Sequence, residues 1–145
     1  MNVRSMLDQK GAHVATIGVG GSLSDAAARL RYLGIGALVV TDDGDSIAGI
    51  LSERDVVRAV ASHGASALGR TVGSVMTTQV VTCVAADTVE HVMTLMTDRR
   101  IRHVPVVDGE DRLRGIVSIG DVVKARLQEL RFENEALTEY LHQGR

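Results

Sequence analysis

The apolar and polar positions of this chain follow the same order twice. Each half opens with a short apolar run, at Val14–Ile17 and at Val80–Val84, which predicts a strand. Apolar residues then recur at intervals of three and four in a polar background, the spacing of a helix that packs one face on a core. The pattern therefore predicts the same strand and the same amphipathic helix at the start of each half.

Serine and threonine mark where these two helices begin. The first helix is expected over Ser24–Leu33, with the hydroxyl of Ser22 or Ser24 accepting a hydrogen bond from its first turn. Thr88 is the corresponding cap in the second half. The apolar face of that second helix is expected to consist of Val89, Val92, Met93, Leu95 and Met96.

Two continuous apolar runs, Ala37–Val40 and Val104–Val107, predict strands that are covered on both faces. Each run is followed by an acidic turn that contains glycine and then by another strand, at Ile47–Leu51 and at Leu113–Ser118. A further helix closes each half. The expected fold class is therefore α/β (α+β), with the element order β-α-β-β-α in each repeat.

The two halves align without a gap when the sequence is shifted by 66 residues, which matches residues 14–59 with residues 80–125. Identical residues gather at strand ends and turns. Two such units are expected to pack about a pseudo-twofold axis, because each buries a sheet face that the other leaves uncovered. This packing places two related clefts between the repeats.

The domain boundaries follow from the repeat. We expect repeat one at residues 8–66, repeat two at 74–130 and a C-terminal helical extension at 131–145. The Gly-, Ser- and Ala-rich segment Ser62–Gly73 predicts a loop between the repeats, and Thr71–Met76 predicts a short helical lead-in to the second.

Apolar residues of the C-terminal tail alternate in spacing between four and three, which is typical of a coiled-coil seam with one polar core position. Two arrangements are open: the helix packs its leucines on its own domain, or it extends an interface with a second chain. This seam consists of Val123, Leu127, Leu130, Asn134, Leu137 and Leu141.

A Ser-x-x-Asp motif ends the last strand of each repeat, as Ser52 to Asp55 and Ser118 to Asp121. The start of a helix exposes free N–H groups and the positive end of the helix dipole, so a hydroxyl and a carboxylate there can hold a phosphate and a ribose. The same spacing also forms a capping box. Two copies in register favour a ligand site, although capping stays a full alternative.

Composition removes several classes of function. Aromatic residues make up 2% of the chain and the net charge is −2, so the stacking platforms and the basic surface that nucleic acids require are missing. The single cysteine, Cys83, allows no disulfide or cysteine-based zinc site within one chain, and the five histidines lack metal-site spacing. Residues 1–11 hold no signal-peptide run and no segment is long enough to span a membrane, so we expect a soluble cytoplasmic protein without a metal centre.

The repeated motifs resemble the cystathionine-β-synthase (CBS) domain, and two in tandem resemble a Bateman module. The motifs that carry the resemblance are Leu51–Asp55, Ile101–Asp108 and Gly115–Asp121, and the resemblance covers roughly residues 8–130. The chain is similar to small stand-alone bacterial proteins with two CBS domains. The resemblance implies adenosine compounds bound in the clefts, with their occupancy transmitted as a change of shape.

The resemblance also implies individual roles. Asp55 and Asp121 would accept hydrogen bonds from the two ribose hydroxyls, because a carboxylate offers two acceptors at the spacing of a vicinal diol. Ser52 and Ser118 would lie near the ribose or the phosphate.

Thr16 and Thr82 match positions that flank the adenine in the family. Arg102 and His103 match positions that point at phosphates, and Arg54 is a further phosphate candidate. Lys10 is a weaker one.

The two clefts are not expected to be equivalent. Repeat one has Gly36 and Ala37 where repeat two has Arg102 and His103, while Arg54 has only a glycine opposite it. Which cleft receives Arg102 and His103 stays open, since a loop of one repeat can reach the aspartate of the other.

The function expected from these observations is a non-enzymatic sensor of an adenosine nucleotide (AMP, ADP, ATP or NAD) that acts as a homodimer on a separate effector protein. The chain lacks a nucleophile and base constellation, and no catalytic cofactor is expected. The alternative is a protein adaptor with vestigial or constitutively filled clefts. Serine and aspartate at both motifs favour the sensor.

Overall fold

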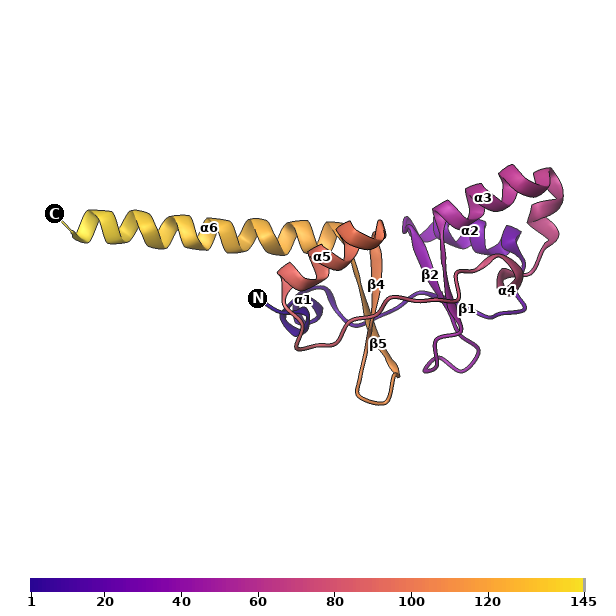
Figure 1. The fold of residues 1–145 in the computed structure, drawn as a ribbon, viewed down its shortest axis with the longest axis horizontal. Coiled ribbons are helices and arrows are strands. Elements are labelled where there is room, and N and C mark those ends of the chain that lie inside the picture. Colours follow the sequence, from indigo (N-terminus) through magenta and orange to yellow (C-terminus); the bar gives the residue numbers. More distant parts are fainter. Residues whose placement is uncertain (145) are drawn as a thin grey trace.

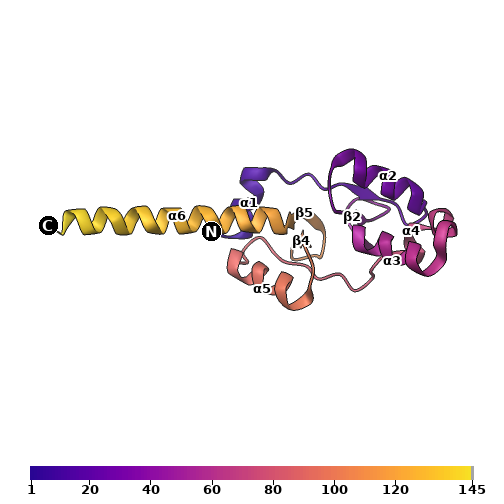
Figure 2. The ribbon, with the colours of Figure 1, turned by 90° about the horizontal axis from the view of Figure 1, so that it is seen from above.

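The computed structural model describes residues 1–144 and places the two predicted repeats side by side, with one helix projecting from the body (Figure 1). Two connecting segments cross between the halves, one after the N-terminal helix and one before repeat two (Figure 2). The chain folds as the two adjacent repeats that its sequence predicts, followed by a C-terminal helix.

Repeat one contains a three-stranded sheet in the order β1 (Thr16–Ile17), β2 (Ala37–Val40), β3 (Gly49–Ser52). Strand β1 runs parallel to β2, and β2 pairs antiparallel with β3. Repeat two contains the antiparallel pair β4 (His103–Val107) and β5 (Leu113–Ser118). All four residues of β2 are buried, as its continuous apolar run predicts.

The strand predicted at Val80–Val84 is reduced to a single parallel bridge between Cys83 and Val106. Cys83 donates its N–H to the carbonyl of Pro105 and accepts a hydrogen bond from the N–H of Val107. The next bond of this ladder would need an N–H at residue 105, which proline lacks. Repeat one has Val39 at the matching position, and its N–H does bond to Ala15.

Helices of repeat one cover its sheet: α2 (Leu23–Leu33), α3 (Glu53–His63) and the short α4 (Val72–Val75). Ser22, one of the two predicted caps, accepts the N-terminal hydrogen bond of α2. The loop predicted at Ser62–Gly73 is wrong in part. The last turn of α3 and a 3-10 helix, Gly64–Gly69, occupy much of it, because buried Ala67 anchors the segment on the core.

Repeat two is covered by α5 (Val89–Arg99), which Thr88 caps as predicted, and by the N-terminal helix α1 (Val3–Lys10). Although α1 precedes repeat one in sequence, Val3 and Met6 lie in the core of repeat two together with Cys83. Burial raises the pKa of the Cys83 thiol to about 12, with Asp87 adding to the effect, so this cysteine is a neutral core residue.

The chain ends in a single helix, α6 (Ile119–Gln143), which is 25 residues long. Its first turns pack on repeat two through Val122 and Ala125, whereas residues 131–144 are all exposed. The seam leucines Leu137 and Leu141 are 56% and 60% exposed. The helix therefore does not pack the second half of its seam on its own domain, which was one of the two open arrangements.

Candidate functional site

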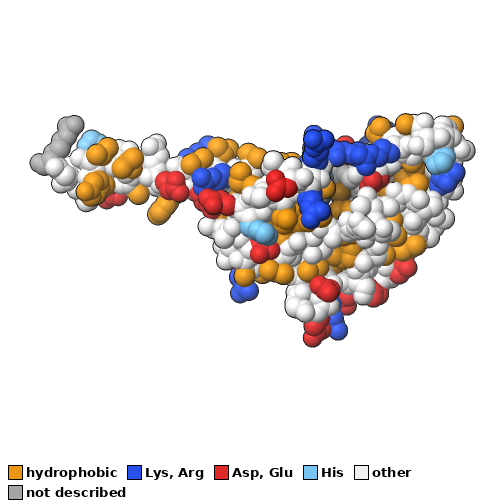
Figure 3. Space-filling model, viewed as in Figure 1, with side chains coloured by type: hydrophobic (Ala, Val, Ile, Leu, Met, Phe, Trp, Pro, Cys, Tyr) orange, Lys and Arg blue, Asp and Glu red, His pale blue; other side chains and the backbone are white. Residues whose placement is uncertain are grey.

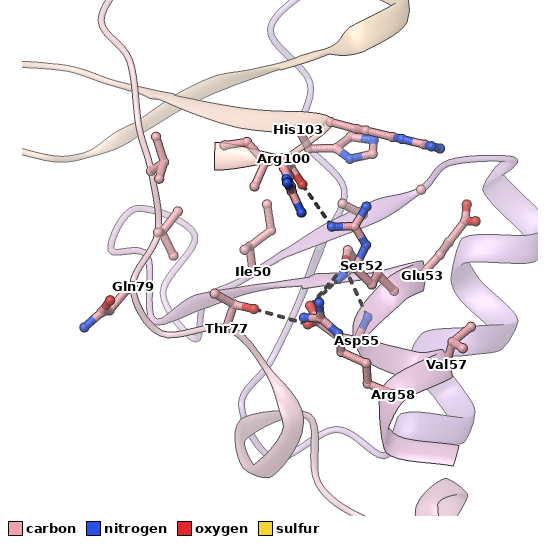
Figure 4. A pocket seen from close by; sticks show the side chains of 17 residues that line it. Ile50, Ser52, Glu53, Asp55, Val57, Arg58, Thr77, Gln79, Arg100 and His103 are labelled. Atoms are coloured by element: carbon pink, nitrogen blue, oxygen red, sulfur yellow. Dashed lines mark hydrogen bonds between the residues drawn. The ribbon is translucent and has the colours of Figure 1, made fainter. Parts of the chain in front are cut away.

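A cleft of about 400 Å³ opens between the repeats and receives side chains from both of them. We call it the Asp55 cleft. The start of α3 contributes Ser52, Arg54 and Asp55, and the start of β4 contributes Arg102 and His103. Ser52, Asp55 and His103 face the same cavity in Figure 4. Five residues predicted as ligand contacts from two distant stretches of sequence thus line one cavity.

Asp55 is held in place by its own helix terminus. Its Oδ2 accepts hydrogen bonds from the N–H and the hydroxyl of Ser52, at 2.9 and 3.1 Å, and the Ser52 hydroxyl in turn accepts the N–H of Asp55. Oδ1 accepts a bond of 3.2 Å from the hydroxyl of Thr77. The capping box is therefore formed, and the same carboxylate lines the cleft.

Four guanidinium groups surround this cleft. Arg54 and Arg58 come from α3 of repeat one, whereas Arg100 and Arg102 come from repeat two. The Nη1 of Arg54 donates to the carbonyl of Arg100 at 2.9 Å, which joins the two halves across the cleft. Basic side chains gather over the boundary of the repeats in the space-filling view (Figure 3).

Sequence reasoning missed Arg58, Arg100 and Thr77 as lining residues. Arg58 could have been found because it lies one helical turn beyond Arg54 and therefore on the same face of α3. Arg100 ends α5 with a left-handed backbone, φ 53°, which turns the chain toward Arg102. No local pattern marks Thr77.

His103 begins β4 and lies against Gly36 of repeat one. A Cβ atom at Gly36 would stand 2.9 Å from Cε1 of His103, so glycine lets the His103 ring lie here without a shift. Burial lowers the pKa of His103, and the nearby carboxylate of Glu53 only partly offsets this effect. His103 is therefore a neutral hydrogen-bonding group at pH 7, not a cation.

The cleft that receives Arg102 and His103 is thus the one whose aspartate belongs to repeat one. Thr16 and Thr82, the predicted adenine neighbours, are not among the lining residues. Near Thr82, the chain contributes Val80 and Val81 to the cleft in its place.

The second motif, Ser118 to Asp121, has the same capping geometry. Asp121 Oδ2 accepts the N–H of Ser118 at 2.8 Å, and the Ser118 hydroxyl accepts the N–H of Asp121 at 3.2 Å. Lys10 adds an ion pair, with its Nζ 2.6 Å from Oδ2 of Asp121. Burial alone would raise the pKa of Asp121, but the bonds from Lys10 and Ser118 outweigh it and lower the pKa.

Residues 1–144 show neither a candidate metal site nor a membrane-spanning helix. No group of three or more histidine, cysteine or acidic residues lies close enough there to hold a metal ion. Among the helices of this range, none combines the length and the apolar character needed to cross a bilayer.

The fold and this cleft define a protein of paired CBS domains. The CBS domain family matches residues 10–62 and 72–128, so the chain belongs to that family. It is 30% identical over 141 residues to the CBS domain-containing protein YhcV of Bacillus subtilis, a match that covers 97% of each chain. It is 40% identical over 124 residues to the mitochondrial CBS domain-containing protein CBSX3 of Arabidopsis thaliana, covering 83% of this chain.

Several curated relatives are longer than this chain. The match spans 60% of CBSX3 and 33% of an uncharacterised protein encoded in a ribosomal RNA operon of Thermofilum pendens. The shared part is therefore the CBS pair.

Solved structures agree with this membership. The CBS-domain protein ATU1752 of Agrobacterium tumefaciens is 48% identical, with a TM-score of 0.83 and coverage of 87% of this chain and 99% of that one. The CBS pair of MJ0100 in complex with 5′-methylthioadenosine and S-adenosyl-L-methionine is 27% identical (TM-score 0.78; coverage 89% and 98%). CBSX2 in complex with AMP is 26% identical (TM-score 0.73; coverage 88% and 96%).

Proposed function

We propose that this chain is a non-enzymatic regulatory module that binds an adenosine nucleotide in the Asp55 cleft. The observation that carries the proposal is that four guanidinium groups line a single cavity between the repeats together with only two carboxylates, those of Glu53 and Asp55. Relatives solved with AMP, 5′-methylthioadenosine or S-adenosyl-L-methionine support an adenosine compound as the ligand. Among these, a phosphorylated one fits the cationic lining best.

Each part of such a nucleotide finds suitable chemistry. Asp55 offers carboxylate oxygen to the ribose hydroxyls, and Ser52 lies beside it. Arg54 and Arg102 can pair with phosphate oxygens in the planar, bidentate way that guanidinium groups allow. The apolar side chains of Ile50 and Val80 are suited to pack on a purine face.

A ligand in this cleft would change how the repeats hold each other. Arg54 belongs to repeat one and Arg102 to repeat two, and like charges gathered in one cavity repel. A phosphate between them removes that repulsion and draws the halves together. The ligand binds more tightly when the two repeats are drawn together, so it raises the population of that arrangement. An effector protein could then sense binding as a change of shape.

We propose further that the protein acts as a homodimer in the cytoplasm. The seam on α6 supports the homodimer, because its aliphatic side chains are exposed and alternate in spacing between four and three residues. Such a seam can pack against the same seam of a second copy. Buried in such a pair, Asn134 would fix the register at a cost in stability.

Deletion of the residues after Arg131 tests the dimer. We expect the deletion to weaken dimerisation at least tenfold and Asn134→Leu to tighten it or change the oligomeric state, as measured by sedimentation velocity at several concentrations. Glu135→Ala, an exposed position outside the seam, is the control. A dimer of unchanged affinity in both seam variants would mean that the seam plays no part in assembly.

A thermal-shift panel with AMP, ADP, ATP, NAD and S-adenosylmethionine tests the nucleotide proposal. A ligand that binds only the folded state raises the melting temperature by mass action, and a concentration at 100 times its Kd adds about 2.7 kcal/mol. The adaptor alternative predicts no shift with any of the five. The same panel on protein that has been unfolded and refolded, to release any resident ligand, distinguishes the two forms of the adaptor. A constitutively filled cleft then gives a shift, and a vestigial cleft gives none.

A further inference from the structure

The two Ser-x-x-Asp motifs differ in the group that covers their aspartate. At the first motif, Thr77 donates its hydroxyl to Asp55 and its N–H to the carbonyl of Ile50, at 3.2 and 2.9 Å. At the second motif, the ammonium of Lys10 bonds to the matching carbonyl and to the aspartate, but on Oδ2, the oxygen that also accepts from the serine, whereas Thr77 bonds to Oδ1 of Asp55. The Nζ of Lys10 lies 2.6 Å from Asp121 Oδ2 and 2.8 Å from the carbonyl of Ile116. The repeat matches Ile116 with Ile50, so a neutral threonine on one side corresponds to a cation on the other.

This difference arises from the length of the helix that packs beside each motif, α4 at the first and α1 at the second. Met76 follows the four-residue α4 and covers Gly49, where a Cβ atom would stand 2.6 Å from its sulfur. At the matching Gly115, a Cβ atom would stand 2.8 Å from Leu7 in the middle of the eight-residue α1. Because α1 continues for one turn beyond Leu7, it carries Lys10 to the second motif instead of an extended chain.

Lys10 has the reach and the charge to hold this position. The side chains of Lys10 and Asp121 are only 30% and 24% exposed, so solvent screens the ion pair weakly. Oδ2 of Asp121 accepts from Lys10 and from the N–H of Ser118, just as Oδ2 of Asp55 accepts two bonds from Ser52, but at Asp121 one of the two donors is a cation that neutralises the carboxylate. A ribose diol that approached Asp121 would have to compete with this ammonium, whereas the donors on Asp55 are neutral.

The surroundings of Asp121 give a phosphate little to compensate for that displacement. Shifting the four arginines of the Asp55 cleft by the 66-residue repeat leads to three glycines and one lysine. These counterparts of Arg54, Arg58, Arg100 and Arg102 are Gly120, Lys124, Gly34 and Gly36.

We propose that Lys10 determines the number of nucleotide sites by occupying the ribose position at Asp121, so that each chain binds one nucleotide in the Asp55 cleft. This inference rests on the proposed function. It gives Lys10 the role of excluding a nucleotide from the second motif. The family resemblance, in contrast, implies that Lys10 contacts a phosphate.

Calorimetric titration with AMP tests the inference through stoichiometry. We expect one AMP per chain for the parent and two for Lys10→Ala, whose shortened side chain uncovers Asp121. The double variant Lys10→Ala with Asp121→Ala should return to one, which shows that the new site uses Asp121. Arg4→Ala, an exposed basic position on the same helix, is the matched control and should stay at one. If Lys10→Ala does not fold, Lys10→Met removes the ammonium while keeping the aliphatic stem.

The outcomes separate this inference from the proposed function. Two sites in the parent, or a single site in both the parent and folded Lys10 variants, overturn the exclusion by Lys10 while the Asp55 cleft remains a nucleotide site. Loss of a site in Lys10→Ala would make Lys10 a ligand contact and also overturns it. No AMP bound to the parent contradicts the proposed function. In that case, a site gained by Lys10→Ala still supports the exclusion, and none gained overturns it.

Discussion

The two Ser-x-x-Asp motifs share a backbone but differ in their electrostatic surroundings. Both form capping boxes, with the aspartate accepting the serine N–H at 2.9 Å in repeat one and 2.8 Å in repeat two. Around Asp55 stand four arginines, whereas Asp121 faces one lysine that is already paired with it. The duplication has therefore kept what a helix needs to begin, and has let the groups that would recognise a ligand diverge.

The divergence is large because each site draws on both repeats. Arg54 and Arg58 lie on the helix of repeat one, and Arg100 and Arg102 lie before the strand of repeat two, yet all four line the same cleft. Each of these two stretches carries arginine where the other repeat has glycine at the matching position. The Asp55 cleft therefore receives more cations from both repeats, and the surroundings of Asp121 receive fewer from both.

The largest effect is expected from Asp55→Ala. Loss of a charge-assisted pair of hydrogen bonds to ribose should weaken AMP binding by about 1.5 to 3 kcal/mol, as measured by calorimetry. Asp121→Ala, the matched change at the other motif, is expected to have the smaller effect. Since both residues cap helices, the melting temperature of each variant must be followed, and Asp55→Asn keeps an acceptor for the cap. Equal binding by the parent and by a folded Asp55→Ala would leave capping as the whole role of the motif.

A smaller and more selective effect is expected from Arg102→Ala. It should weaken AMP binding by about 1.5 kcal/mol, since a hydrogen bond to a charged group is lost, and should change adenosine binding little, because adenosine lacks the phosphate. Arg99→Ala, an exposed arginine of α5 outside the cleft, is the control. Parallel titrations with AMP and adenosine give the measurement, and equal losses for the two ligands would contradict a phosphate contact.

The smallest effect concerns the Lys10–Asp121 pair and its dependence on pH. The folded pKa of Asp121 lies below its ordinary value of 3.8, so the pair stabilises the fold above that pH, and its contribution is lost as the pH falls through the folded pKa. Urea unfolding should find Lys10→Ala less stable than the parent by about 1 kcal/mol at pH 7.

At pH 3 the gap between the parent and Lys10→Ala should be narrower than at pH 7. Arg4→Ala should show no such narrowing. A gap of the same size at both values would mean that the ion pair does not contribute.

The sequence by itself determined the elements of this protein. Strand β2, the caps at Ser22 and Thr88, both capping boxes and the 66-residue repeat are where the pattern predicts them. These features depend on side-chain spacing and on hydrogen bonds between residues three or four apart, which are local. Even the shortened first strand of repeat two has a local cause in Pro105, whose missing N–H could have been weighed from the sequence.

Only the tertiary structure decided which distant residues meet. It placed Arg102 and His103 beside Asp55, brought α1 from the start of the chain into the core of repeat two, and set Lys10 on Asp121, more than a hundred positions away in sequence. The repeat made two assignments of Arg102 equally consistent, since its pattern is the same in both halves. The packing of the repeats chose between them, and the glycine at position 36 lets the His103 ring approach repeat one without a shift.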